Sequence, residues 1–202
     1  LPTESARARW LKEAFLEVGV GALVPADETG GVWNEMLVKF NRIVPFSTIT
    51  AVCRSGIGFV IEEPKAKALL LQVLKEGIAV SKAHGGILKD SFEDDYIASL
   101  SNLKKDAVAS LTRDMVASRP SELHEQLGAM LRLADEKSVS APAIAFAYAA
   151  LLPQENAARA KMQALASPAT SAVTVFLSHS ERRLVVAAVV GCIVGLVVAR
   201  RR

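Results

Sequence analysis

Apolar residues recur every three or four positions along most of residues 6–166, which is the spacing of one face of an α-helix. Three such stretches end at helix-ending residues: residues 6–18 before Gly19, residues 64–84 before Gly85, and residues 141–152 between Pro142 and Pro153. Alternating runs of β-branched residues, typical of strands, are few. The pattern therefore predicts an all-α protein.

Residues 32–59 carry a further helical pattern that contains a proline. The apolar face begins with Trp33, Met36, Leu37 and Phe40. Proline lacks a backbone donor and crowds the preceding turn, so we expect the helix to break or kink at Pro45. The pattern then resumes and continues toward residue 58.

Two more helices are predicted on either side of a turn at residues 119–120. The stripe before the turn consists of Leu100, Leu103, Ala107, Leu111 and Met115, which we interpret as one helix. Pro120 suits the first turn of the following helix, and Glu122 is then favoured by the positive end of the helix dipole. A role in stabilising that helix end is the simplest explanation of Glu122, and a functional role is the alternative.

The C-terminal part of the sequence has a different composition. Residues 153–182 are interpreted as a helix extension and linker, and residues 183–202 as a membrane anchor. The uncharged segment 184–199 lies between arginines and would be about 24 Å long as a helix. A buried strand or core helix is the alternative. With the anchor, the helical domain would stay on the cytoplasmic side, and Gly191 and Gly195 would support a homodimer; without it, the protein would be cytoplasmic.

Charge, cysteine and histidine content give no indication of nucleic-acid binding, a disulfide framework or a metal site. The net charge is +3, and Arg200, Arg201 and Arg202 account for the excess, so no basic face indicates nucleic-acid binding. The two cysteines lie far apart and do not suggest a disulfide framework. The three histidines show no metal-ligand spacing, so no metal site is predicted.

A glycine pair at residues 19–21 is the best candidate for a nucleotide-binding loop. Such a loop requires a strand before it and a helix after it, whereas here a predicted helix precedes Gly19 and Pro25 follows soon after. We therefore predict no cofactor-binding residues in this sequence. The chain begins with Leu1 instead of methionine, and we expect it to be a fragment.

Two segments together resemble the C-terminal domain of the ketopantoate reductases (2-dehydropantoate 2-reductases). The first contains Ser110, Asp114, the turn Arg119-Pro120-Ser121-Glu122, and Gly128; the second contains Thr50, Ala51, Arg54 and Gly58. The resemblance covers about residues 5–152 and implies a helical domain similar to that of 6-phosphogluconate dehydrogenase relatives. We therefore assign residues 1–152 to this domain, with residues 1–20 as the last helix before it.

The resemblance also implies an activity. Members of the family reduce 2-dehydropantoate to pantoate in pantothenate biosynthesis, using NADP(H) bound mainly by a Rossmann domain that this sequence lacks. The family's catalytic lysine falls on Glu35, and Lys39 lies one helical turn further on the same face. Ile43 stands where the family has an asparagine. We predict Lys39 and Glu122 as catalytic residues and Ser110 and Asn41 as substrate-binding residues; an exposed Glu35–Lys39 pair is the alternative.

Two functions therefore follow from the sequence. The first is the substrate-binding, catalytic half of an NADPH-dependent oxidoreductase that acts on a small 2-keto acid, inactive in the absence of its other half. The second is a membrane-anchored helical binding or dimerisation module that has lost catalysis, which the glutamate at residue 35 favours.

Overall fold

The computed structural model describes residues 6–24 and 30–166. In these residues the chain forms eight α-helices joined by loops, with no strand, so the all-α prediction is confirmed for this part of the chain. The helices are α1 (Ala6–Glu17), α2 (Gly31–Cys53), α3 (Ile57–Glu62), α4 (Pro64–Ala83), α5 (Phe92–Ser101), α6 (Ser110–Val116), α7 (Leu123–Glu136) and α8 (Pro142–Ala166).

The chain divides into two compact units, Leu1–Ala160 and Lys161–Arg202. The core and the cavities described below belong to the first unit.

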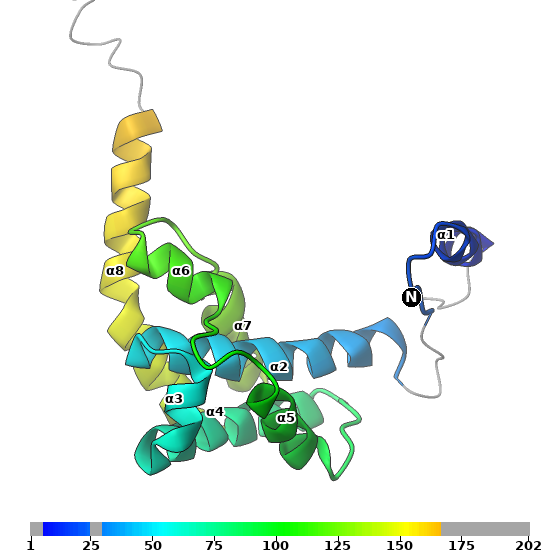
Figure 1. Ribbon diagram of the computed structural model, residues 1–202, viewed down its shortest axis with the longest axis horizontal. Helices are drawn as coiled ribbons and strands as arrows, with labels where there is room; N and C mark the ends of the chain where they lie inside the picture. The colour runs from blue at the N-terminus through cyan, green and yellow to red at the C-terminus, as the bar shows by residue number, and fades with distance from the viewer. Residues whose placement is uncertain (1–5, 25–29, 167–202) are drawn as a thin grey trace, which may run out of the picture. The chain divides into compact units, whose positions relative to one another are not determined.

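Helix α2 is the central helix of this unit, and it packs against α3, α4, α6 and α7 (Figure 1). It begins after Gly30, whose φ of 81° is rarely adopted by residues with a side chain. The helix does not break at Pro45, which was one of the two expected outcomes, because Pro45 lies inside one continuous helix. Proline removes one helical hydrogen bond, but the buried residues on both sides of Pro45 hold the helix in place by packing.

Two apolar clusters form the core. The larger joins α2, α4, α6, α7 and α8, and its fully buried members include Val44, Val73, Val80, Leu123, Leu127, Met130 and Ile144. The smaller joins α2, α3, α4 and α5 through Ile49, Ile57, Val60, Leu70, Leu74, Phe92, Tyr96 and Leu100. Burying one large aliphatic side chain contributes about 1.5–3 kcal/mol, so these clusters fix the order of the helices.

The single helix expected from Leu100 to Met115 is wrong. Helix α5 ends at Ser101, and residues 102–109 form a loop before α6 begins at Ser110. The loop does not continue the helix, because its carbonyl oxygens accept hydrogen bonds from the start of α3. Ile57 N donates to Ala107 O at 2.9 Å, and Gly58 N donates to Lys105 O at 3.0 Å. A Cβ at Gly58 would lie 2.7 Å from Lys105 Cα, so the loop can approach only a glycine.

Helix α8 is longer than expected. The stop predicted at Pro153 is wrong, because α8 continues through this residue to Ala166. Pro153 is exposed, so water can solvate the carbonyl that loses its partner, while Glu155 and Ala158 remain buried beyond it. The boundary expected at residue 152 therefore falls inside a helix.

The N-terminal end of α8 is held by a buried carboxylate from α4. Glu76, 4% exposed, accepts hydrogen bonds from Ala143 N and Ile144 N, both at 3.0 Å. A carboxylate at this end of a helix satisfies donors that have no partner within the helix. Glu76 thus joins α4 to α8.

No helix within residues 6–24 and 30–166 is long and apolar enough to cross a membrane. The predicted anchor at 184–199, with Gly191 and Gly195, lies outside the described residues.

Candidate functional site

Two adjacent cavities lie beside α2, the first against α7 and the second against α5, the start of α6 and the start of α7. The first, called the apolar cavity, has a volume of about 470 Å³ and is lined by Trp33, Met36, Leu37, Lys39, Phe40, Ile43, Glu122, Glu125, Gln126, Ala129 and Leu133. The second, called the serine cavity, has a volume of about 410 Å³ and is lined by Arg42, Ile43, Phe46, Ser47, Tyr96, Ser99, Leu100, Leu103, Ala109, Ser110, Glu122 and Gln126. Ile43, Glu122 and Gln126 line both cavities, so the two share a boundary.

Lys39 and Glu122 line the same apolar cavity, although they lie 83 positions apart in the sequence, Lys39 in α2 and Glu122 directly before α7. Glu35, at the position of the family's lysine, is exposed and does not line either cavity. Glu35 and Lys39 lie one helical turn apart on α2, and of the two only Lys39 lines a cavity. A cationic amine and a carboxylate beside one apolar surface can together bind a polar group on a small molecule.

Glu122 is the residue immediately before α7 begins at Leu123. Pro120 lies before the helix, so its expected place in the first turn is wrong, whereas the expected position of Glu122 at the helix start is confirmed. The Glu122 side chain does not cap the backbone. Instead, Gln126 Nε2 donates to Glu122 Oε2 at 2.8 Å, which directs the carboxylate along the cavity.

A buried network fixes the turn before Glu122. Glu155, which is fully buried, accepts from Ser121 N at 3.0 Å and from Ser121 Oγ at 2.6 Å. Arg159 Nε donates to Glu155 Oε1 at 2.6 Å, and Arg159 Nη2 donates to Ser121 O at 2.9 Å. Charge-assisted hydrogen bonds of this kind are the stronger ones in proteins, so α8 holds Ser121 and thereby positions Glu122.

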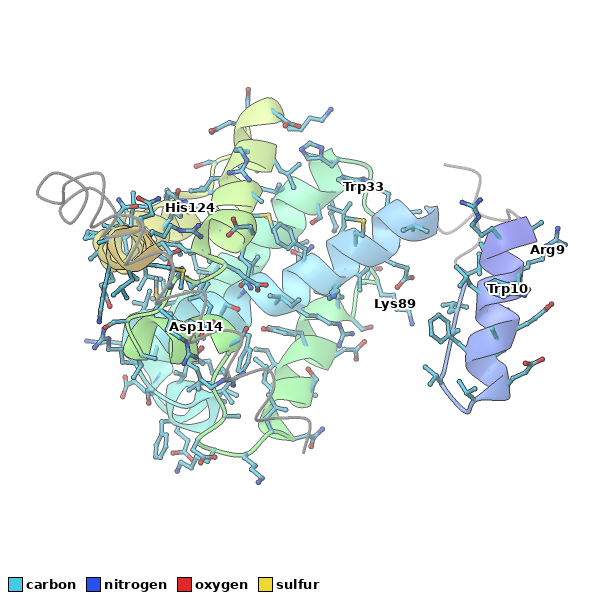
Figure 2. The ribbon with its side chains drawn as sticks, turned by 90° about the horizontal axis from the view of Figure 1, so that it is seen from above. Arg9, Trp10, Trp33, Lys89, Asp114 and His124 are labelled. Carbon is cyan, nitrogen blue, oxygen red and sulfur yellow. The ribbon has the colours of Figure 1, made fainter. Side chains whose placement is uncertain are left out.

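Asp114 supports the same turn from α6. Arg119 donates to Asp114 Oδ1 through Nη2 at 2.6 Å and through Nε at 3.0 Å. Figure 2 shows Asp114 on α6, far from Trp33, which lies in the first turns of α2. The pair is exposed and contributes about 0–1 kcal/mol, so its main effect is on the geometry of the turn.

Ser110 is the first residue of α6 and lines the serine cavity together with Glu122. The start of α6 is held against α2 by a buried pair of hydroxyls, because Thr50 Oγ1 and Thr112 Oγ1 lie 2.7 Å apart. Thr50 Oγ1 also accepts from Ala109 N at 3.4 Å. The structure therefore brings Lys39, Glu122 and Ser110 to one pair of cavities.

Asn41 is not part of this site. It is fully buried and lines neither cavity. Its Nδ2 donates to Leu37 O at 2.9 Å and to Ser81 Oγ, so the side chain lies between α2 and α4. The prediction that Asn41 binds substrate does not fit this location, because residue 41 is on a different face of α2 from Lys39.

Gln126 and Arg42 line the cavities but were not predicted from the sequence. Gln126 is 7% exposed, and its Oε1 is buried without a hydrogen-bond partner among the described residues. A buried acceptor without a partner costs free energy. No sequence signal marked Gln126, because a glutamine one turn into a helix is common.

Arg42 lies beside Tyr96 in the serine cavity. Tyr96 OH donates to Arg42 O at 2.9 Å, and the Arg42 guanidinium lies 5.6 Å from the centre of the Phe92 ring. Burial raises the pKa of the Tyr96 phenol well above its ordinary value, so Tyr96 remains a protonated donor at neutral pH. Within residues 6–24 and 30–166, no group of three or more metal-ligating side chains is placed to hold a metal.

Solved structures with a similar fold are ketopantoate reductases and a related dehydrogenase. A dimeric ketopantoate reductase from Staphylococcus aureus is 19% identical with a TM-score of 0.70, and the match covers 77% of this chain and 52% of that protein. A 2-dehydropantoate 2-reductase from Methylococcus capsulatus is 20% identical with a TM-score of 0.67, covering 76% and 48%. These identities show a common fold, and this chain spans about half the length of these reductases.

A third solved structure with a similar fold is that of a dehydrogenase with a different name. The structure of a D-mandelate dehydrogenase with NADH and anilino(oxo)acetate is 15% identical with a TM-score of 0.64, and the match covers 76% of this chain and 63% of that protein. No curated protein matches the sequence significantly.

The family itself is identified by its sequence model, described as ketopantoate reductase PanE/ApbA C terminal, which matches residues 32–155. The match begins at the start of α2 and ends at Glu155, so it contains the residues that line both cavities, together with Ser121 and Glu155 of the buried network, whereas Arg159 lies beyond it. The chain belongs to the ketopantoate reductase C-terminal domain family.

Proposed function

We propose that this chain is the substrate side of the active-site cleft of an NADPH-dependent 2-dehydropantoate 2-reductase. The observation that carries the proposal is that Lys39 and Glu122 line one cavity in a chain that belongs to this family. The adjoining serine cavity adds Ser110, so three of the four residues selected from the sequence line one or both of the two cavities.

In the proposed reaction, Lys39 is the general acid. As the ketone of the substrate is reduced, its oxygen gains negative charge, and the Lys39 ammonium donates a proton to that oxygen. Glu122 accepts a hydrogen bond from the substrate's hydroxyl, and Gln126 holds the carboxylate in place through the 2.8 Å bond. Ser110 contributes a hydroxyl on the side of the serine cavity.

The described residues do not fit the cofactor itself. A dinucleotide is held by a strand, a glycine-rich loop and a helix whose N-terminus faces the phosphates, and residues 6–24 and 30–166 contain no strand. The hydride would therefore come from NADPH held by a Rossmann domain outside this part of the chain.

The test is to express the chain joined to the sequence that lies upstream in its gene, and to follow NADPH oxidation with 2-dehydropantoate. Lys39→Ala is expected to lower kcat by about 10²–10⁴, the typical contribution of a general acid. Lys82→Ala removes the same charge from an exposed residue of α4 that lines neither cavity, and should leave kcat unchanged. Equal rates for the Lys39 variant and the wild type would reject the proposed acid.

One observation favours a second candidate function. Glu35 occupies the position of the family's lysine, which is consistent with a helical binding module that has lost catalysis. On sequence grounds, residues 184–199 would anchor this module in a membrane, with the helical domain on the cytoplasmic side. A joined protein that binds 2-dehydropantoate but oxidises no NADPH would support this second function.

A further inference from the structure

We propose that Arg42 binds the carboxylate of the substrate in the serine cavity and so selects a 2-keto acid over an uncharged ketone. The proposal rests on the proposed function and specifies it further, because it assigns the anionic end of the substrate to a residue of this chain. The ketone would then lie toward Lys39 and the carboxylate toward Arg42.

The positions of the two cations on α2 suit such a substrate. Arg42 follows Lys39 by three residues, so the two lie on neighbouring turns about 4.5 Å apart along the helix axis. Lys39 lines the apolar cavity and Arg42 lines the serine cavity, and Ile43 lines both. A small molecule at the shared boundary can therefore reach both side chains.

The Arg42 guanidinium is available to a ligand. It makes no hydrogen bond or ion pair with another residue in the described ranges, while its contact with the Phe92 ring limits its freedom. The backbone carbonyl of Arg42 is fixed independently, because it accepts the Tyr96 hydroxyl at 2.9 Å. A guanidinium held against an aromatic ring keeps its planar donors free for a carboxylate, which it can bind through two parallel hydrogen bonds.

The charges of the cavity explain why an arginine is needed. Glu122 lines the same cavity and would repel a carboxylate, so an anion can bind there only beside a cation. The Glu122 carboxylate provides an acceptor at the boundary of the two cavities, where Gln126 Nε2 donates to its Oε2 at 2.8 Å. The site thus matches a molecule with a carboxylate at one end and a hydroxyl donor elsewhere, which is the chemistry of a hydroxylated 2-keto acid.

The test measures binding to the full chain and needs no cofactor. The probes are 2-oxoisovalerate and its neutral primary amide, which have the same shape and differ in charge, and their dissociation constants are measured by NMR titration. The wild type should bind the acid about tenfold more tightly than the amide or better, because charge-assisted hydrogen bonds exceed neutral ones by about that factor.

Arg42→Met keeps the aliphatic stem and removes the charge, so this variant should bind acid and amide equally. Arg42→Lys should retain part of the preference, since an ammonium lacks the planar pair of donors. Lys82→Met is the matched control for the loss of one positive charge and should behave as the wild type. The Arg42 variants keep the Tyr96 bond, which uses the backbone, and circular dichroism verifies that they fold.

An unchanged preference in Arg42→Met, no preference in the wild type, or an equal loss in Lys82→Met would each overturn the proposal. The joined enzyme separates this result from the proposed function. Reduction of 2-dehydropantoate with an unaltered KM in Arg42→Met would reject the role of Arg42 and keep the function. A carboxylate preference that depends on Arg42, without any reduction by the joined enzyme, would reject the function and keep the binding site.

Discussion

Replacing Glu155 by alanine should destabilise the domain strongly, because its carboxylate is fully buried and serves three donors. Ser121 N, Ser121 Oγ and Arg159 Nε would lose their acceptor, and the first two are buried. Removing one partner of a buried charged network typically costs about 3–5 kcal/mol. The side chain of Arg159 is 38% exposed and can regain water, which places the expected loss near the lower end of that range.

The assay is urea unfolding of the full chain, followed by circular dichroism at 222 nm. A loss of about 3 kcal/mol is a large share of the total stability of a domain, about 5–15 kcal/mol. Glu155→Gln keeps an acceptor for Ser121 and removes only the charge, so it should cost about 1–3 kcal/mol and stay measurable if the alanine variant does not fold.

Glu125→Ala is the matched control. Glu125 approaches the same arginine at 3.8 Å, but its side chain is 64% exposed, so its removal should cost less than about 0.5 kcal/mol. If the alanine variants at 155 and 125 differ by less than about 1 kcal/mol, the buried network does not hold the turn before Glu122, and the reasoning is refuted.

Three further predictions concern other parts of the chain. Tyr96→Phe should lower the free energy of unfolding by about 1 kcal/mol, because the hydrogen bond to Arg42 O is lost. Burial raises the folded-state pKa of Tyr96, so the wild type should lose stability relative to Tyr96→Phe above about pH 10, where the phenol ionises in the unfolded state. Plots of unfolding free energy against pH that stay parallel for the two proteins from about pH 9 to 11 would contradict this. Gly77→Ala should destabilise the domain, because the added Cβ would lie 2.7 Å from Asn41 Oδ1. This cost should exceed the gain of about 1 kcal/mol that alanine brings in helix propensity, and a higher melting temperature for the variant would refute this. The full chain should resist carbonate extraction from membranes through residues 184–199, whereas a chain ending at Ser180 should be released, and equal release of both would reject the anchor.

Several helices could be predicted from their apolar stripes, although the stripe from Leu100 to Met115 crossed a loop. The start of α7 is an example, because Leu123, Leu127 and Met130 form a buried face and Glu122 precedes it. The helix break that the sequence allowed at Pro45 and the stop predicted at Pro153 did not occur, since Pro45 is compensated by packing on both sides and Pro153 by exposure to solvent. Packing and exposure both depend on the tertiary structure and leave no local signal.

The candidate site could also be predicted only in part from the sequence. Lys39, Ser110 and Glu122 were selected through a resemblance together with helical spacing, and they line the two cavities. Asn41 was selected for its nearness to Lys39 in the sequence, but a shift of two residues turns a helical side chain to another face. Arg42 and Gln126 were missed because their importance comes from what surrounds them. Arg42 lines a cavity and has no hydrogen bond or ion pair from its guanidinium among the described residues, and Gln126 has a buried amide oxygen without a described partner.

The central claim is that the paired cavities beside α2 bind a 2-keto acid. The most direct measurement is a titration of the isotope-labelled full chain with 2-dehydropantoate, followed by amide chemical shifts. We expect the shifts to concentrate in residues 33–47 of α2, in residues 122–129, and at Ser110, and to saturate. No saturable shifts at millimolar concentration, or shifts concentrated in the contact between α4 and α8, would contradict the account.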